Sequence, residues 1–290
     1  MATDIDQVYI QTYESTVRFL AQQGITRLRP WVMERSVQSV NHNWERLGSD
    51  EATQKGAGLT ATPTDTYTWS RRKSTAKTYH TADSTEHEDI AQMLVDPNSS
   101  LAYAMGMAMK RAHDNEIITA ATGTSLDGDS APVAFLASQE VGTGAASSIT
   151  YDNVTEVTEI FMNNNIDPDM EKVMVVSPAQ ARKLLQLTEA TSGDYNAVRP
   201  LTSQGYIESW MGYSWVVSTL LPNGSTGAGS KYCFAMTKKA IGMQVNKDIW
   251  CRVAEDPTNS FAWRIYCAST YGAIRVEDEH LVRLDLSETI

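Results

Sequence analysis

The chain has 290 residues, of which 42% are hydrophobic and 20% are charged. This is the balance of a globular protein and excludes a disordered chain, and the length allows one large domain or two ordinary ones. The net charge of −11 argues against tight binding of nucleic acid, because contacts to phosphates need an excess of Lys and Arg. The sequence has no long apolar run and no signal-peptide pattern, so we expect no membrane partner and no export.

The first part of the chain predicts an arm followed by a long hairpin. Residues 4–23 place apolar side chains on one face of a predicted amphipathic helix. Two β-prone stretches, 31–40 and 67–79, flank a segment rich in Gly, Thr and Ala, 48–63. This pattern predicts a polar hairpin within residues 31–85. The hairpin has too few large apolar residues to bury a core of its own, so it needs a partner surface.

The longest predicted helix covers residues 98–122, with Pro97 before it and Gly123 after it. Its predicted buried stripe consists of Leu101, Ala104, Met105, Ala108 and Ala112. The charged residues Lys110, Arg111, Asp114 and Glu116 lie mostly off that stripe. Because small side chains dominate the stripe, we expect the helix to pack closely against a sheet.

The remainder predicts an α/β region followed by long strands. A Gly/Ser/Ala-rich loop, 123–148, leads to a helix that Asp152 caps and to a short buried strand, 173–176. Ser177 at the N-cap, Pro178 at the first helical position and Gln180 predict the next helix start. Further strands are predicted at 215–218, 232–236, 249–255, 261–270 and 281–286, with a turn at 256–259.

The three cysteines, Cys233, Cys251 and Cys267, contain no CxxC pair. An odd number without such a pair argues against a disulfide framework or a zinc site. We therefore expect three buried, reduced thiols that pack as small hydrophobic side chains.

Two segments could carry chemistry, but neither has a specific spacing. The first is the cluster His80, Asp83, Glu86, His87, Glu88 and Asp89. It matches no zinc signature, so we interpret it as a polar turn and the acidic start of a helix, with a metal-dependent hydrolase as the alternative. The second, 224–231, lacks the spacing of a phosphate-binding loop and precedes a strand, so we expect a surface loop. The sequence thus predicts no enzyme, no cofactor and no metal.

Charge is distributed unevenly along the chain. Residues 31–80 include seven basic and five acidic residues, whereas the remainder has seventeen basic and thirty acidic residues. A mildly basic segment on an acidic body predicts attraction between subunits of the same kind. The predicted inter-subunit contacts are Arg46, Lys55, Arg71, Arg72, Lys73 and Lys77.

The order of these elements resembles the coat protein fold of tailed bacteriophages, of the Hong Kong 97 type, over essentially the whole chain. The most specific stretch, 173–185, resembles the family's strand, helix start and following helix. Residues 210–218 with Leu221-Pro222 look like its glycine turn and valine-rich strand, and 268–275 is similar to its late strand. No single motif is diagnostic, and the ordered set carries the resemblance.

The resemblance implies an α+β fold with five parts. These are an N-terminal arm over residues 1–30, a hairpin called the E-loop over 31–85, a peripheral domain with a spine helix over 86–150, an axial domain over 151–240, and long C-terminal strands returning to the peripheral domain over 241–290. In this family the hairpin reaches over a neighbouring subunit.

The function that the resemblance implies is that of a major capsid protein. Such subunits form pentamers and hexamers of an icosahedral virion shell, assembled in the host cytoplasm, that encloses double-stranded DNA without tight binding. Implied partners are a portal protein and, in some relatives, decoration proteins. We expect a separate scaffold protein, because about thirty residues before the hairpin are too few for a long helical scaffolding segment. An encapsulin-like nanocompartment, which has the same fold and holds a cargo enzyme, and the soluble hydrolase stay as alternatives.

Overall fold

The computed structural model describes residues 22–50, 52, 54–56, 58, 64, 66–86, 97–142, 148–187 and 208–289. The predicted α+β fold is confirmed. The chain divides into two compact units. The first unit comprises residues 1–25, 78–111 and 248–269, and the second comprises 26–77, 112–247 and 270–290. The predicted helix over 4–23 lies outside the described residues.

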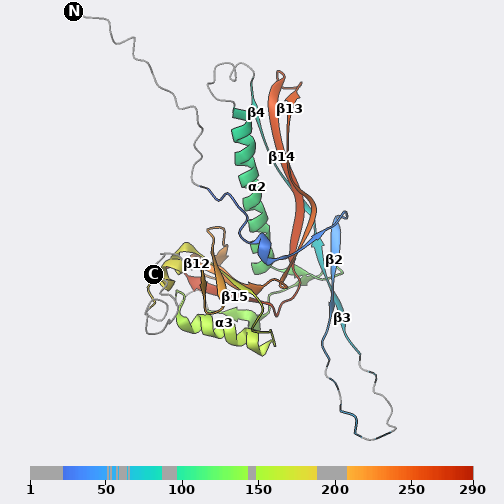
Figure 1. The fold of residues 1–290 in the computed structure, drawn as a ribbon, viewed down its shortest axis with the longest axis vertical. Helices are drawn as coiled ribbons and strands as arrows, with labels where there is room; N and C mark the ends of the chain where they lie inside the picture. Colours follow the sequence, from blue (N-terminus) through green and yellow to red (C-terminus); the bar gives the residue numbers. More distant parts are fainter. Residues whose placement is uncertain are drawn as a thin grey trace, which may run out of the picture. The chain divides into compact units, whose positions relative to one another are not determined.

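Helices and strands are labelled in Figure 1. The described helices are η1 (Arg29–Trp31) and η2 (Ala137–Gln139), both of the 3-10 type, α2 (Pro97–Thr122), α3 (Tyr151–Asn163) and α4 (Pro178–Leu184). The strands up to α3 are β1 (Met33–Ser36), β2 (Asn41–Leu47), β3 (Trp69–Thr75), β4 (Lys77–Thr85), β5 (Ser125–Leu126), β6 (Pro132–Val133) and β7 (Glu140–Val141). The later strands are β8 (Lys172–Val176), β9 (Ser209–Trp210), β10 (Tyr213–Val217), β11 (Asn223–Gly224), β12 (Gly227–Thr237), β13 (Ile241–Asp256), β14 (Ala262–Arg275) and β15 (Leu281–Ser287).

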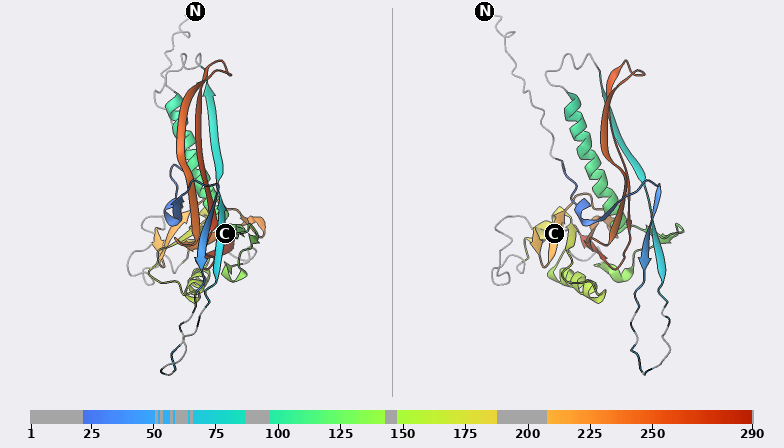
Figure 2. Two further views of the ribbon diagram at one scale, coloured as in Figure 1. Left: turned by 90° about the vertical axis from the view of Figure 1, so that its right-hand side faces the viewer. Right: turned by 45° about the vertical axis from the view of Figure 1, so that its right-hand side comes forward.

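The first unit is built on the long strands β13 and β14, which run beside β4 with α2 along them (Figure 2). Met105 and Met109 of α2 form a buried cluster with Ile265 and Cys267 of β14, and Leu101 packs against it. The predicted stripe is therefore right at its N-terminal end. It is wrong beyond Met105, because the buried side chains there are Met107 and Met109, at 5% and 3% exposed, whereas Ala108 and Ala112 are only half-buried.

The first described residues, 22–24, lie on the same helix. Lys110 Nζ donates a hydrogen bond to the carbonyl oxygen of Gly24 at 3.2 Å, and Arg111 donates one to Gln22 Oε1 at 2.7 Å. The two cations that lie off the predicted stripe thus hold residues 22–24 against α2.

Cys251 and Cys267 form a disulfide between β13 and β14. The prediction of three reduced thiols is therefore wrong for this pair. Cys251 lies five residues before the end of β13 and Cys267 lies five residues after the start of β14. The two cysteines face each other directly across the hairpin, with 4.1 Å between their Cα atoms. The prediction holds for Cys233, which is a free buried thiol, and burial raises its pKa to about 12.

We expect the disulfide to stabilise the protein measurably. The two cysteines are 16 residues apart in the sequence. A crosslink over this span lowers the conformational entropy of the unfolded chain, which stabilises the folded state by ~3 kcal/mol. Cys251→Ser should therefore lower the free energy of unfolding by about that amount in an oxidising buffer, measured by urea titration. Reductant should bring the native protein to the same midpoint and leave the variant unchanged. Equal midpoints of native protein and variant in the oxidising buffer would contradict this.

The second unit is built on a seven-stranded sheet in the order β7-β15-β12-β8-β10-β9, with β11 paired to β12. β8 lies inside this sheet and Val173–Val176 are fully buried, which confirms the predicted buried strand. β15 pairs antiparallel with β12, so the predicted last strand joins the same sheet as β8. The predicted surface loop at 224–231 is exposed at residues 225–229. Its loop conformation is wrong, because β11 and β12 form a tight hairpin whose turn residue Ser225 donates hydrogen bonds to the Asp285 carboxylate.

The helix starts in the second unit follow local sequence. Ser177 Oγ accepts a hydrogen bond from the backbone N–H of Gln180, as predicted for α4. The Gln180 side chain does not reach back to the cap, because it accepts from Ile149 N–H and donates to the Ser287 carbonyl instead. The predicted cap Asp152 is wrong, since Thr150 caps α3 in a reciprocal capping box with Asn153.

The C-terminal half of α2 lies in the second unit and is more enclosed. Asp114 and Glu116, which were expected off the buried stripe, are only 2% and 6% exposed. The Asp114 carboxylate accepts the backbone N–H groups of Arg27 and Leu28, at 2.9 and 3.2 Å. A helix 26 residues long meets different neighbours along its length, so one stripe does not describe both ends. None of the described helices is long and apolar enough to cross a membrane.

Candidate functional site

The predicted hairpin is formed by β2 and β3, which pair antiparallel from Asn41↔Thr75 to Leu47↔Trp69. The expected first strand, 31–40, is wrong. Its residues 33–36 form β1, which pairs in parallel with the first residues of β13, the part of that strand in the second unit, from Met33↔Gly242 to Ser36↔Val245. A polar hairpin of two strands is marginal by itself, and the side chains at its base provide the missing attachment.

Trp44 is the apolar anchor of the hairpin. It is 8% exposed and packs with Ile274 and Val276. A Cβ atom at Gly242 would come within 2.6 Å of the indole ring, so only glycine on β13 leaves room for it. The indole Nε1–H donates to Ser74 Oγ at 3.1 Å. The otherwise polar hairpin thus has one large buried side chain, which its composition did not predict.

A polar chain continues from this anchor. Ser74 Oγ donates to Gln244 Oε1 at 2.6 Å. The Gln244 amide donates to the carbonyl oxygens of Ser39 and Val40, at 3.0 and 3.1 Å. All of these side-chain groups are buried or half-buried, and each has a partner, as buried polar groups require. The hairpin base is therefore fixed to β13 in one register.

Two arginines, one from each strand of the hairpin, hold the acidic turn between β14 and β15. Arg46 of β2 pairs with Glu277 at 3.1 Å and with Glu279 at 3.4 Å. Arg72 of β3 is 6% exposed and pairs with Asp278, a residue 206 positions away in the sequence. These contacts anchor the hairpin to the rest of the second unit.

Asp278 also accepts a hydrogen bond from Arg275 at 2.5 Å. Arg275 is 1% exposed and donates to the carbonyl oxygens of Gly123 and Ala134 as well. Burial lowers the pKa of Arg275 from its ordinary value, while Asp278 raises it. One carboxylate therefore neutralises two buried guanidinium groups, Arg72 and Arg275, and its removal would leave both uncompensated.

The structure divides the six predicted contact residues into two groups. Arg46 and Arg72 are engaged within the chain, as described above. Lys55, Arg71, Lys73 and Lys77 keep accessible side chains on the hairpin or at its base, although three of them have partners within the chain. Leu47 and Trp69, which face each other at the far end of the paired strands, are 55% and 72% exposed. Neither the acidic turn nor this exposed apolar pair was predicted from the sequence.

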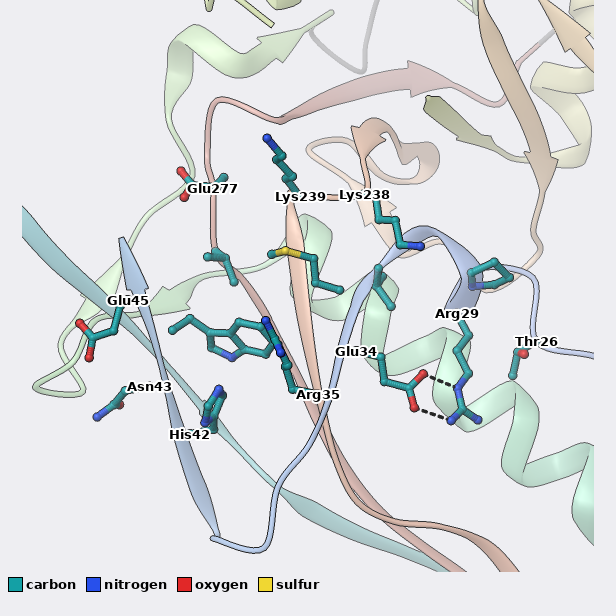
Figure 3. Close-up of a pocket in the computed structure, with 15 residues that line it drawn as sticks. Thr26, Arg29, Glu34, Arg35, His42, Asn43, Glu45, Lys238, Lys239 and Glu277 are labelled. Carbon is teal, nitrogen blue, oxygen red and sulfur yellow. Dashed lines mark hydrogen bonds and ion pairs between the residues drawn. The ribbon is translucent and has the colours of Figure 1, made fainter. Parts of the chain in front are cut away.

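An open groove of about 1090 Å³ lies beside the hairpin base in the second unit (Figure 3). Its lining includes β1, β2 and the turn at Lys238 and Lys239. The Glu34 carboxylate accepts two hydrogen bonds from Arg29, at 2.7 and 2.9 Å. The groove is thus a surface of mixed charge next to the predicted contact segment.

The cluster predicted between His80 and Asp89 forms no site in the described part of the chain. His80 and Asp83 lie in β4 and not in a turn, and the His80 ring stacks on Tyr266 at 6.0 Å. His87, Glu88 and Asp89 lie outside the described residues. Among the described residues, no three His, Cys, Asp or Glu side chains could hold a metal ion together.

Comparison with known proteins shows the family to which this chain belongs. A family model described as "Phage capsid protein" matches residues 5–288. The chain belongs to the phage capsid protein family. This confirms the predicted resemblance and favours a virion protein over the nanocompartment and hydrolase alternatives. No curated protein matches the chain in sequence.

Solved capsid structures share the fold of this capsid protein. The capsid of the cyanophage P-SCSP1u is 15% identical with a TM-score of 0.78, over 99% of this chain and 95% of that chain. The capsid of a native GTA particle is 15% identical with a TM-score of 0.74, over 99% and 98% of the two chains. The mature capsid of bacteriophage PhiM1 is 15% identical with a TM-score of 0.73, over 96% and 92%.

Proposed function

We propose that this capsid protein is the major shell subunit of a tailed phage, with a structural and not a catalytic role. Copies would assemble in the host cytoplasm into pentamers and hexamers of an icosahedral shell around double-stranded DNA. The observation that carries the proposal is the family match over residues 5–288. A portal protein, a separate scaffold protein and decoration proteins are the further partners that we propose.

We propose the five-part division for this chain as well, with residues 31–85 as the hairpin that contacts a neighbouring subunit. The hairpin supports this role, because its paired strands are fixed by Trp44 and the two arginines, while Leu47 and Trp69 at the last pair are exposed. A rigid base with exposed apolar side chains at the end suits a contact with another molecule. Among the cations, Lys55, Arg71, Lys73 and Lys77 remain available for neighbours.

Reversing two of these charges should impair assembly in a salt-dependent way. Arg71→Glu with Lys73→Glu should lower the yield of shells at about 0.05 M salt by about tenfold, because like charges across an interface cost several kcal/mol. Raising the salt to about 1 M should restore much of the yield, since the Debye length falls to about 3 Å. Light scattering and electron microscopy at both concentrations measure this.

The fold should survive, because the Arg71–Glu45 pair is exposed on both sides and such pairs contribute little to stability. Arg182→Glu, on the exposed side of α4, is the matched control and should assemble normally. A defect that is equally large at both salt concentrations would indicate lost packing and not charge.

A further inference from the structure

The groove in Figure 3 contains both acidic and basic residues, but only basic side chains in it lack an ion-pair partner among the described residues. Each carboxylate in its lining already has an arginine partner, with Glu34 on Arg29, Glu45 on Arg71 and Glu277 on Arg46. The lining also contains three exposed cations, Arg35, Lys238 and Lys239. No hydrogen bond or ion pair joins their side chains to the described part of the chain. On a chain with a net charge of −11, such a site suits an acidic partner.

The exposed face of α3 has the complementary pattern. Asp152, Glu156 and Glu159 are spaced by four and three residues, so they share one face of the helix. All three are exposed, and their carboxylates have no hydrogen bond or ion pair to the described residues. Like charges at this spacing destabilise a helix by a few tenths of a kcal/mol per pair. A cationic partner surface would relieve that repulsion.

Other carboxylates of the second unit are less suitable occupants, because many are engaged. Asp127 accepts backbone N–H groups of its own turn, Glu140 pairs with Arg283, and Glu288 accepts from Ser177. α3 is also firmly held, since Val154, Val157 and Phe161 are buried on its opposite side. It can therefore present its acidic face without local unfolding.

We propose that the acidic face of α3 in one capsid subunit docks into the cationic groove of a second copy. Asp152, Glu156 and Glu159 would face Arg35, Lys238 and Lys239. The groove volume of about 1090 Å³ slightly exceeds the range of about 300–1,000 Å³ for ligand pockets, so the groove can accept side chains from a helix face. The two surfaces differ, so the contact is heterologous, and a contact of this type forms a ring when its rotation closes. This inference rests on the proposed shell function and assigns one contact to the ring of subunits.

Charge reversal on either side alone tests the groove and the helix separately. Lys238→Glu with Lys239→Glu, and in a second protein Glu156→Lys with Glu159→Lys, should each lower the yield of rings and shells by about tenfold, because like charges now face each other. Glu171→Lys and Arg182→Glu, exposed charges outside both surfaces, are the controls. Equal loss in the controls would overturn the proposal, because total charge would then explain the effect.

Combining the four substitutions in one chain provides the decisive rescue. The groove is then acidic and the helix face basic, so the subunit is complementary to itself again, and rings and shells should return to near the native yield. This readout stays informative if a double variant is unstable, since only restored pairing recovers assembly. Failure of the fourfold variant, with folding confirmed by circular dichroism, would overturn the assignment of α3 as the occupant.

Mixing the two double variants gives a further result that only this pairing predicts. One has two acidic surfaces and the other two basic surfaces, so they must alternate around a ring. Alternation fits six subunits but not five, so the mixture should form hexamers and no closed icosahedral shells. Closed shells from the mixture would contradict the proposal. If the native protein formed no rings at all, the proposed function itself would fail, which is a distinguishable outcome.

Discussion

Deleting residues 48–63 is expected to abolish closed shells while leaving soluble, folded subunits or capsomers. The deleted segment lies beyond the paired strands of the hairpin, because β2 ends at Leu47 and β3 begins at Trp69. The contacts that fix the hairpin base, Trp44 and the two arginines, remain in place. Folding should therefore persist and only the contact with a neighbour should be lost.

Size-exclusion chromatography and electron microscopy measure this result. A shortened link of two glycines and two serines in place of 48–63 lets the strands still pair, since short flexible loops are inexpensive to close. Thermal unfolding within a few degrees of the native protein is the control for an intact fold. Normal shells from the deletion variant would show that the hairpin does not reach a neighbour in the way proposed.

Replacing Asp278 is expected to give the largest loss of stability of any single substitution considered. Asp278→Asn removes the charge that neutralises Arg72 and Arg275, both almost fully buried. Removing one partner of a buried ion pair costs about 3–5 kcal/mol, because the remaining charge stays buried. For a protein of this size the midpoint of thermal unfolding should fall by on the order of 10 °C.

The neighbouring Glu279 offers a matched control on the same turn. Its carboxylate is 49% exposed and lies 3.4 Å from Arg46, and a pair of this kind contributes less than about 1 kcal/mol. Glu279→Gln should therefore move the midpoint by no more than about 2 °C. Similar shifts of the unfolding midpoint for the two variants in differential scanning calorimetry would contradict this. They would mean that the buried Asp278 ion pairs contribute no more to stability than the exposed Glu279 pair.

The sequence predicts those parts of the fold that depend on local patterns. Four consecutive apolar residues, Val173–Val176, followed by Ser177 and Pro178, specify a buried strand and a helix start without reference to distant residues. The long strand pair after residue 249 was also predictable, because a turn sequence separates two β-prone stretches. In each case the physical cause acts over a few neighbouring residues.

The parts that sequence analysis missed depend on pairing across the chain. The disulfide required the correct hairpin register. Predicted strand ends at Glu255 and Phe261 place Cys251 four residues from one end and Cys267 six from the other, whereas the actual ends at Asp256 and Ala262 make both distances five. The expectation of reduced thiols rested on the odd number of cysteines and the missing CxxC pair, and neither feature takes the pairing of β13 with β14 into account.

The same holds for the candidate site. Arg72 reads as one cation of a basic triplet, and only its position opposite Asp278, 206 residues away, makes it a buried anchor. Trp44 reads as one of several scattered tryptophans until Gly242 provides the space for its ring. Residue type alone therefore did not separate Arg46 and Arg72, which hold the hairpin, from the cations that keep accessible side chains.

Electron microscopy of the purified full-length protein tests the central claim most directly. The shell-subunit account predicts pentameric and hexameric rings and closed shells built from them, with irregular shell sizes when no scaffold protein is present. A protein that stays monomeric at every concentration, or particles that consistently hold a co-purified enzyme as cargo, would contradict it.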